Sequence, residues 1–253
     1  MKLHRYLIPA VALTTTLALA PAAIAQTDST ATTRPERPGE RAGARAERRD
    51  QMIEAVKSRC LAQIDRRQRA LEAERRRLTE ADALSDAHRA ALLRINNSVS
   101  NGLAALADEI QAEDNGEELR GECRRIVEDF RVFVLVRPRA RLVLASDRAR
   151  HAVDRLTKVA ADLQSAIDKA KADGRDTAAA EAQLATMRDA IATAKDKADG
   201  VFDAVIGLSA ADYNANHDIL NPARESVKAA REAIRAAVTA ARAARQDLQS
   251  TES

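Results

Sequence analysis

The feature that most constrains this chain is the regular spacing of apolar residues along its second half, where they recur in alternating steps of three and four. The first series consists of Leu142, Ala145, Ala149, Ala152, Leu156, Val159, Leu163, Ala166 and Ala170. Two further series run from Ala180 to Val205 and from Ala223 to Leu248. This spacing places one apolar stripe on each helix and is typical of coiled coils. The second half is therefore predicted to contain three long helices.

The first half follows the same helical pattern. Residues 46–78 and 86–112 carry apolar stripes, and a third stripe begins near Glu117. Short polar turns separate the stripes, as expected between antiparallel helices. The chain therefore predicts an all-α fold. It is expected to be an elongated pair of antiparallel three-helix coiled-coil bundles, residues 46–137 and 138–253, that share one long central helix.

The most apolar segment after the N-terminus, residues 130–145, joins the two predicted bundles. Its valines and phenylalanines suit a β-hairpin with Arg137 and Pro138 near the turn, but it contains no Gly or Asn for a tight turn and both flanks are strongly helical. We therefore predict a helix. Proline lacks a backbone N–H and clashes with the carbonyl group four residues earlier, so the helix is expected to kink at Pro138 and to continue to about Ala172.

The N-terminus has the pattern of a signal peptide. A basic start precedes an apolar run over residues 7–20, and small residues lead up to Ala25. The run is shorter than the ~20 residues that a membrane-spanning helix needs. We therefore expect residues 1–25 to be a signal peptide that is cleaved near Ala25. The remaining chain is expected to be exported, either periplasmic or extracellular, and not to span a membrane.

Residues 26–45 are rich first in Ser and Thr and then in Arg, Glu, Pro and Gly, with no apolar periodicity. This composition predicts a disordered tether. Its arginines are candidates for binding an anionic envelope polymer. The glutamates among them favour the simpler interpretation of a solvated linker.

Charge and aromatic content restrict the class of partner. The 41 basic residues include Lys2 and Arg5 of the predicted signal peptide, so the remaining chain carries 39 basic against 38 acidic residues. With no Trp, two Tyr and three Phe, it offers little surface for stacking bases. A nucleic-acid partner is therefore not expected. Net charge also alternates in sign between successive predicted helices, which favours antiparallel neighbours and a monomer over parallel self-association.

The two cysteines test the predicted layout. At about 1.5 Å per residue, an antiparallel arrangement brings Cys60 on the first helix and Cys123 on the third to nearly the same level. Two cysteines on apolar stripes of an exported chain predict a disulfide. A free thiol or a metal pair is less favoured, because neither cysteine has a nearby His or a CxxC partner.

The sequence contains no nucleophile motif, no Gly-rich phosphate loop and no paired metal-ligand spacing, so we expect no enzyme, no catalytic residue, no metal site and no cofactor. Two groups of residues are candidates for a partner or ligand surface. The first comprises Arg137, Arg139 and Arg141, and the second comprises Asp212, Tyr213, Asn214, Asn216, His217 and Asp218.

Each group also has a purely structural interpretation. The arginines interrupt an apolar stretch and, if that stretch is buried, must reach solvent or the carboxylates of Glu128 and Asp129. In the second group, Ser209 and Asp212 form the pattern of a capping box, and the rest reads as a turn.

Part of the chain resembles known proteins. The segment from Val132 to Asp147, the later segment from Leu208 to Asn214 and the Ala/Arg-rich final helix resemble exported coiled-coil proteins of high-GC bacteria. This resemblance covers roughly the last half of the chain and implies a helical fold and export. The signal peptide, basic pI and long helical arms are also similar to Skp-type periplasmic chaperones, although the β-rich trimerisation body of those chaperones has no counterpart here.

These observations lead to one expected function and two alternatives. We expect a non-catalytic exported protein that acts as a spacer or adaptor in the cell envelope and binds other envelope proteins. The first alternative is a Skp-like holdase chaperone, which needs exposed apolar grooves. The second, a ligand-binding or enzymatic protein that uses the Tyr213 to Asp218 segment, is the least favoured.

Overall fold

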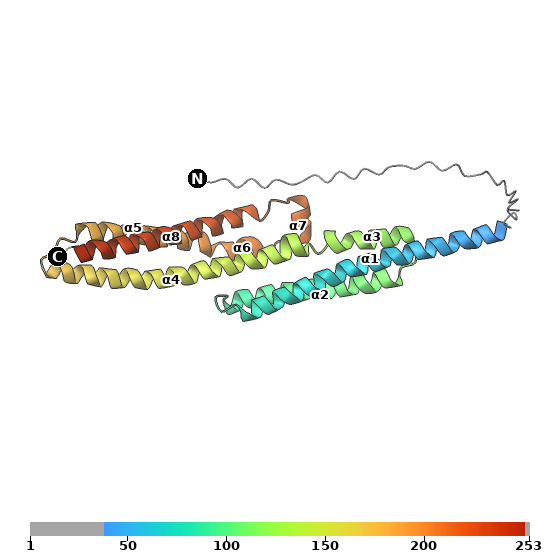
Figure 1. Ribbon diagram of the computed structural model, residues 1–253, viewed down its shortest axis with the longest axis horizontal. Helices are drawn as coiled ribbons and strands as arrows, with labels where there is room; N and C mark the ends of the chain where they lie inside the picture. Colours follow the sequence, from blue (N-terminus) through green and yellow to red (C-terminus); the bar gives the residue numbers. More distant parts are fainter. Residues whose placement is uncertain (1–37, 251–253) are drawn as a thin grey trace, which may run out of the picture. The chain divides into compact units, whose positions relative to one another are not determined.

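The computed structural model describes residues 38–250 and is all-helical, with no strand among these residues. The predicted signal peptide lies outside the described residues, as does the predicted tether up to residue 37. The elements are α1 (Pro38–Glu80), α2 (Asp86–Ala112), α3 (Gly116–Glu128), the π-helix η1 (Val132–Val136), α4 (Arg137–Ala172), α5 (Ala178–Asp199), α6 (Val201–Ile206), α7 (Ala210–Ala215) and α8 (Asn221–Ser250) (Figure 1). The described residues from Arg45 onward belong to one compact unit, and the packing below is that of this unit.

The helices α1, α2 and α3 share a core of large aliphatic side chains. Its buried members are Ile53, Cys60, Ile64, Leu71, Leu103, Leu106, Ile110, Leu119, Ile126, Val132 and Val136. The apolar stripes predicted for the first half supply most of these residues. Full burial of each Leu or Ile side chain contributes about 1.5–3 kcal/mol before the entropy of ordering the chain is counted.

The disulfide predicted from the antiparallel layout is present. Cys60 in α1 and Cys123 in α3 are joined, with their sulfur atoms 2.01 Å apart and their Cα atoms 5.6 Å apart. The bond crosses the core of α1, α2 and α3 and ties together positions that are 63 residues apart in the sequence.

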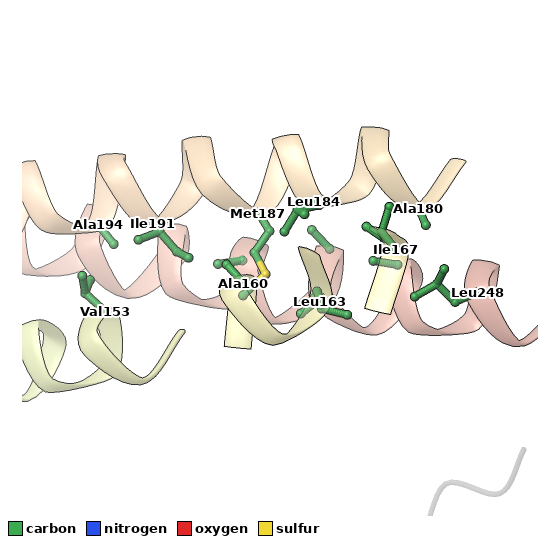
Figure 2. Close-up of a cluster of buried hydrophobic side chains, with 14 of the residues drawn as sticks. Val153, Ala160, Leu163, Ile167, Ala180, Leu184, Met187, Ile191, Ala194 and Leu248 are labelled. Carbon is green, nitrogen blue, oxygen red and sulfur yellow. The ribbon is translucent and has the colours of Figure 1, made fainter. Parts of the chain in front are cut away.

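The helices α4, α5 and α8 share a second core, in which small side chains predominate. Figure 2 shows Val153, Ala160, Leu163 and Ile167 of α4 directed toward Leu184, Met187 and Ile191 of α5, with Leu248 of α8 beside them. Eight of the fifteen buried residues of this core are alanine. Small side chains allow neighbouring helix axes to come close, and α5 and α8 lie close together along much of their length.

A third cluster of buried side chains draws on both halves of the chain. Its members come from α1, α2, η1, α4, α6, α8 and two of the connecting segments, and include Leu78, Leu92, Leu135, Val143, Val205 and Leu220. The sequence predicts two bundles that lie end to end and share the central helix. The third cluster adds contacts between the first half of the chain and the second through several helices.

The central helix is not continuous, which corrects the prediction of a single helix kinked at Pro138. α3 ends at Glu128, and Arg131 adopts the left-handed conformation (φ 43°, ψ 36°) before η1 begins. Pro138 lies directly after η1, within a helical run that continues from η1 through α4, so the helix passes through the proline as predicted. The chain therefore breaks several residues before the proline.

Two other boundaries differ from the sequence prediction. α1 begins at Pro38, so residues 38–45, which we assigned to a disordered tether, are helical. The helix predicted through Val205 is divided at Gly200 into α5 and α6. Glycine is among the weakest helix formers, and the propensity cost of about 1 kcal/mol is consistent with a break at this position.

Candidate functional site

The two candidate groups named from the sequence lie next to each other in the structure. We use "junction" for residues 129–139, which include η1, and "α6–α8 connection" for residues 207–220, which include α7. Figure 1 shows α7 beside the gap between α3 and α4. The Asn214 side chain donates a hydrogen bond to the backbone oxygen of Glu128, at 3.0 Å. The antiparallel return of α5 and α6 thus brings together segments about 80 residues apart.

Arg131 makes further contacts across this boundary. Its Nε donates a hydrogen bond to the side-chain oxygen of Asn214, and its guanidinium lies 5.6 Å from the centre of the Tyr213 ring. A left-handed conformation costs a non-glycine residue about 1–2 kcal/mol. Favourable contacts of Arg131 with Asn214 and Tyr213 help to offset this cost at the place where the central helix breaks.

The remaining residues of the second candidate group are used mainly within the α6–α8 connection. Ser209 and Asp212 form a capping box for α7, and hydrogen bonds from Ser209 hold the pKa of the Asp212 carboxyl below its ordinary value. Asn216 accepts a hydrogen bond from the backbone N–H of Asp218 at 2.9 Å. His217 lies with its ring 5.2 Å from that of Tyr213. These residues therefore form a turn that is stabilised by a helix cap and by hydrogen bonds within the segment itself.

The three arginines of the first group have different environments. Arg137 pairs with the buried carboxylate of Glu74, its Nε lying 3.5 Å from the carboxylate oxygen. Arg139 is 3% exposed, and Arg141 is exposed. We expected these side chains to reach solvent or the acids of the preceding helix end. Arg137 instead pairs with α1, and Arg139 donates to the backbone oxygen of Leu208.

Within the junction, η1 leaves two apolar side chains exposed. Phe133 is 37% and Val134 is 39% exposed. The guanidinium carbons of Arg66, Arg67 and Arg137 lie 5.5, 5.5 and 5.9 Å from the centre of the Phe133 ring. Burial, and to a smaller extent the charge of Arg66, lowers the pKa of Arg67. We call these five residues the Phe133 surface.

A part-buried polar network connects α2 to α4, and no local pattern in the sequence predicts it. The Nδ1 atom of His88 lies 2.9 Å from both oxygens of Asp147, and the backbone N–H of Ser85 donates to the same carboxylate at 2.9 Å. The His88 ring is stacked on Phe202, with the ring centroids 3.8 Å apart. This network attaches the turn between α1 and α2 to α4, and the three side chains are too far apart in sequence to form a recognisable motif.

Within residues 38–250, no group of three or more His, Cys, Asp or Glu side chains is placed to hold a metal ion. A separate finding for the same part of the chain is that none of its helices is both long enough and apolar enough to cross a membrane. Comparisons of the chain with family models, with curated proteins and with solved structures give no match. Function is therefore argued from the residues of this chain alone.

Proposed function

We propose that this is a non-catalytic exported helical protein that acts as a spacer or adaptor in the bacterial cell envelope. The observation that carries the proposal is the Phe133 surface, where an exposed aromatic ring lies close to three arginines and the next residue is an exposed valine. Apolar side chains with a border of one charge suit a partner segment that carries apolar and acidic residues. Other envelope proteins are the partners that this chemistry favours.

The finer architecture belongs to the same proposal. We infer that α1, α2 and α3 form one antiparallel coiled-coil bundle and that α4, α5 and α8 form another. The two shared cores and the three–four spacing of their apolar residues support this arrangement. A crystal structure of the mature chain tests it, because side chains that fail to interlock between α4, α5 and α8 would contradict a coiled coil.

Export is supported by the pattern of residues 1–25 and by the disulfide, since disulfides persist in oxidising compartments. The test is to produce the full chain with a C-terminal tag in a bacterial host and to isolate it from each cell fraction. We expect an N-terminus near Gln26, oxidised cysteines and recovery outside the cytoplasm. Recovery of the uncleaved chain in the cytoplasm with reduced cysteines contradicts export.

The adaptor function is tested by photocrosslinking in cells. A crosslinking amino acid at Val134 probes the Phe133 surface, and one at the exposed residue Thr239 in α8 serves as the control. We expect one or two dominant envelope proteins to be captured at Val134 and not at Thr239. The double charge reversal Arg66→Glu with Arg67→Glu should abolish this capture, whereas reversal of the exposed Arg59 and Arg69 on the same helix should not.

The holdase alternative predicts a different result. A holdase should yield a broad set of unfolded clients at both probe positions, with little dependence on Arg66 and Arg67. In the described residues, the exposed large apolar side chains are Met52, Val127, Phe133 and Val134. This small set offers less support for the extended apolar grooves that a holdase needs.

A further inference from the structure

A cavity of about 250 Å³ lies where the junction meets α2 and the α6–α8 connection. Apolar side chains of α2, η1 and α6 form much of its wall, among them Val99, Leu135 and Ile206. Exposed residues, including Ser98 and Ser209, also line it, so the cavity is open to solvent. One buried charged residue, Arg139, is among those that line it.

The hydrogen bonding of Arg139 is incomplete. The side chain is on a residue only 3% exposed, and one of its terminal nitrogens donates to the backbone oxygen of Leu208. Its Nε is buried without a hydrogen-bond partner. A guanidinium carries five N–H donors, and each buried donor that stays unpaired destabilises the folded state.

Two other buried charges in the described part of the chain, those of Lys57 and Glu74, have ionic partners. Lys57 donates to a carboxylate oxygen of Asp114 at 3.0 Å, and the buried Glu74 accepts from Arg77 at 2.9 Å. For Arg139, burial lowers the pKa of the guanidinium and no neighbouring carboxylate acts against this effect. Asp129, the acid that lines the cavity, pairs instead with Arg125 at 3.2 Å. A buried cation without a counter-ion destabilises the folded state.

The cavity defines the class of anion that would suit Arg139. A planar guanidinium matches a carboxylate, whose two oxygens accept parallel hydrogen bonds. The apolar wall around it favours a hydrocarbon or aromatic body over a second charge. Since pockets for drug-sized ligands occupy roughly 300–1,000 Å³, a volume of about 250 Å³ suits a smaller molecule.

We propose that this cavity binds a small monoanionic carboxylate with an apolar body, whose head group pairs with the guanidinium of Arg139. The proposal goes beyond the adaptor function and does not depend on it, because the cavity is distinct from the Phe133 surface. The ligand would supply the missing counter-ion and cover the apolar wall.

The test uses the oxidised mature chain and sodium benzoate as the probe, with sodium chloride as the matched salt and benzamide as the neutral analogue. Isothermal titration calorimetry and thermal unfolding measure binding. We expect benzoate to bind and to raise the melting temperature. Sodium chloride and benzamide should each have at most a small effect. Equal effects of benzoate and chloride, or of benzoate and benzamide, would overturn the proposal.

Arg139→Met removes the charge and keeps an apolar side chain of similar length. It should weaken benzoate binding on the order of 100-fold, since removing one partner of a buried charge pair has a large effect. Without benzoate, the variant should melt at the same or a higher temperature, because an unpaired buried charge is lost. The control is Arg141→Met at the exposed neighbour, which should leave benzoate binding unchanged.

A second variant keeps the test decisive if Arg139→Met does not fold. Ala210→Leu places three more carbon atoms at the cavity wall and leaves Arg139 in place. It should reduce benzoate binding at least tenfold. Unchanged benzoate binding in Arg139→Met, or in Ala210→Leu, would show that benzoate binds elsewhere and would refute the site.

Discussion

The cores on the two sides of the junction are built from side chains of different size. The core of α1, α2 and α3 has no alanine among its buried members, and a disulfide crosses it. In the core of α4, α5 and α8, eight of fifteen buried residues are alanine. One core thus buries much apolar area on each side chain, and the other relies on close approach of the helix backbones.

The difference indicates how each core should respond to change. In a core of large side chains, a substitution by a smaller residue leaves a cavity and destabilises the fold. A disulfide across such a core stabilises it by restricting the unfolded chain. A core of alanines has little side-chain volume to lose. It also has little room for a larger side chain. We therefore expect the first core to be sensitive to reduction and the second to be sensitive to added volume.

The largest expected effect separates the cores by their redox sensitivity. Closing a loop between positions 63 residues apart contributes about 4 kcal/mol in the chain-entropy description. Reduction should therefore lower the unfolding temperature of α1, α2 and α3 far more than that of α4, α5 and α8. Hydrogen exchange with and without reductant measures both regions at once. The double variant Cys60→Ser with Cys123→Ser should lose its response to reductant, and equal destabilisation of both regions by reduction would contradict the assignment.

The second prediction concerns the coupling between the cores. Asp147→Ala removes the buried carboxylate that His88 and the backbone N–H of Ser85 contact, and these part-buried hydrogen bonds are lost. We expect a loss of about 3 kcal/mol and separate unfolding of the two cores, visible as two transitions in calorimetry. Asp154→Ala, at an exposed position of the same helix, is the control. A single transition of unchanged midpoint would argue against a coupling role.

The third prediction tests the alanine-lined core directly. Ala237 in α8 is fully buried, whereas its neighbour Ala236 is exposed. Ala237→Leu should destabilise the protein by about 1–3 kcal/mol, because the helices have to move apart to admit the larger side chain. Ala236→Leu should be nearly neutral. Urea unfolding of the two variants provides the measurement, and similar midpoints would mean that the helices are less closely packed than described.

The smallest effect is a pH dependence that arises at Lys57 in α1. The hydrogen bond with Asp114 raises the pKa of the Lys57 ammonium above its ordinary value. A raised pKa in the folded state adds stability below the unfolded pKa of 10.5, and this contribution disappears as pH rises through the higher folded value. Lys57→Met should therefore flatten the alkaline decline in stability. If the stability of the variant falls with rising pH as steeply as that of the unchanged chain, other groups cause the decline.

Much of the fold was predictable because helical periodicity is a local signal. The stripes of all the long helices, the capping box of Ser209 with Asp212 and the pairing of Cys60 with Cys123 follow from spacing along the chain. The break before α4 was not predictable in the same way. Proline is the strongest local signal there, but the chain breaks at Arg131, which contacts Asn214 at a distance of 83 residues in the sequence.

For the candidate site, the sequence predicts which segments take part but not that they contact each other. Arg139 and the α6–α8 connection were both named from the sequence, but nothing in the spacing indicated that they meet. Arg139 is buried because the backbone oxygen of Leu208, 69 residues away, approaches it after α5 and α6 return along α4. The contact of His88 with Asp147 spans 59 residues and joins α2 to α4. Such contacts depend on tertiary packing and leave no local pattern.

The π-helix η1 also determines the rotational phase of everything that follows it. The backbone N–H of Val136 reaches the oxygen of Arg131, five residues earlier, so this turn holds one residue more than an α-helical turn. Each residue of an α-helix advances the direction of its side chain by about 100°. A chain one residue shorter within η1 would start α4 out of phase by about that angle and would turn Leu163 and Ile167 away from α5 and α8. The length of one five-residue turn therefore sets the orientation of the entire alanine-lined core.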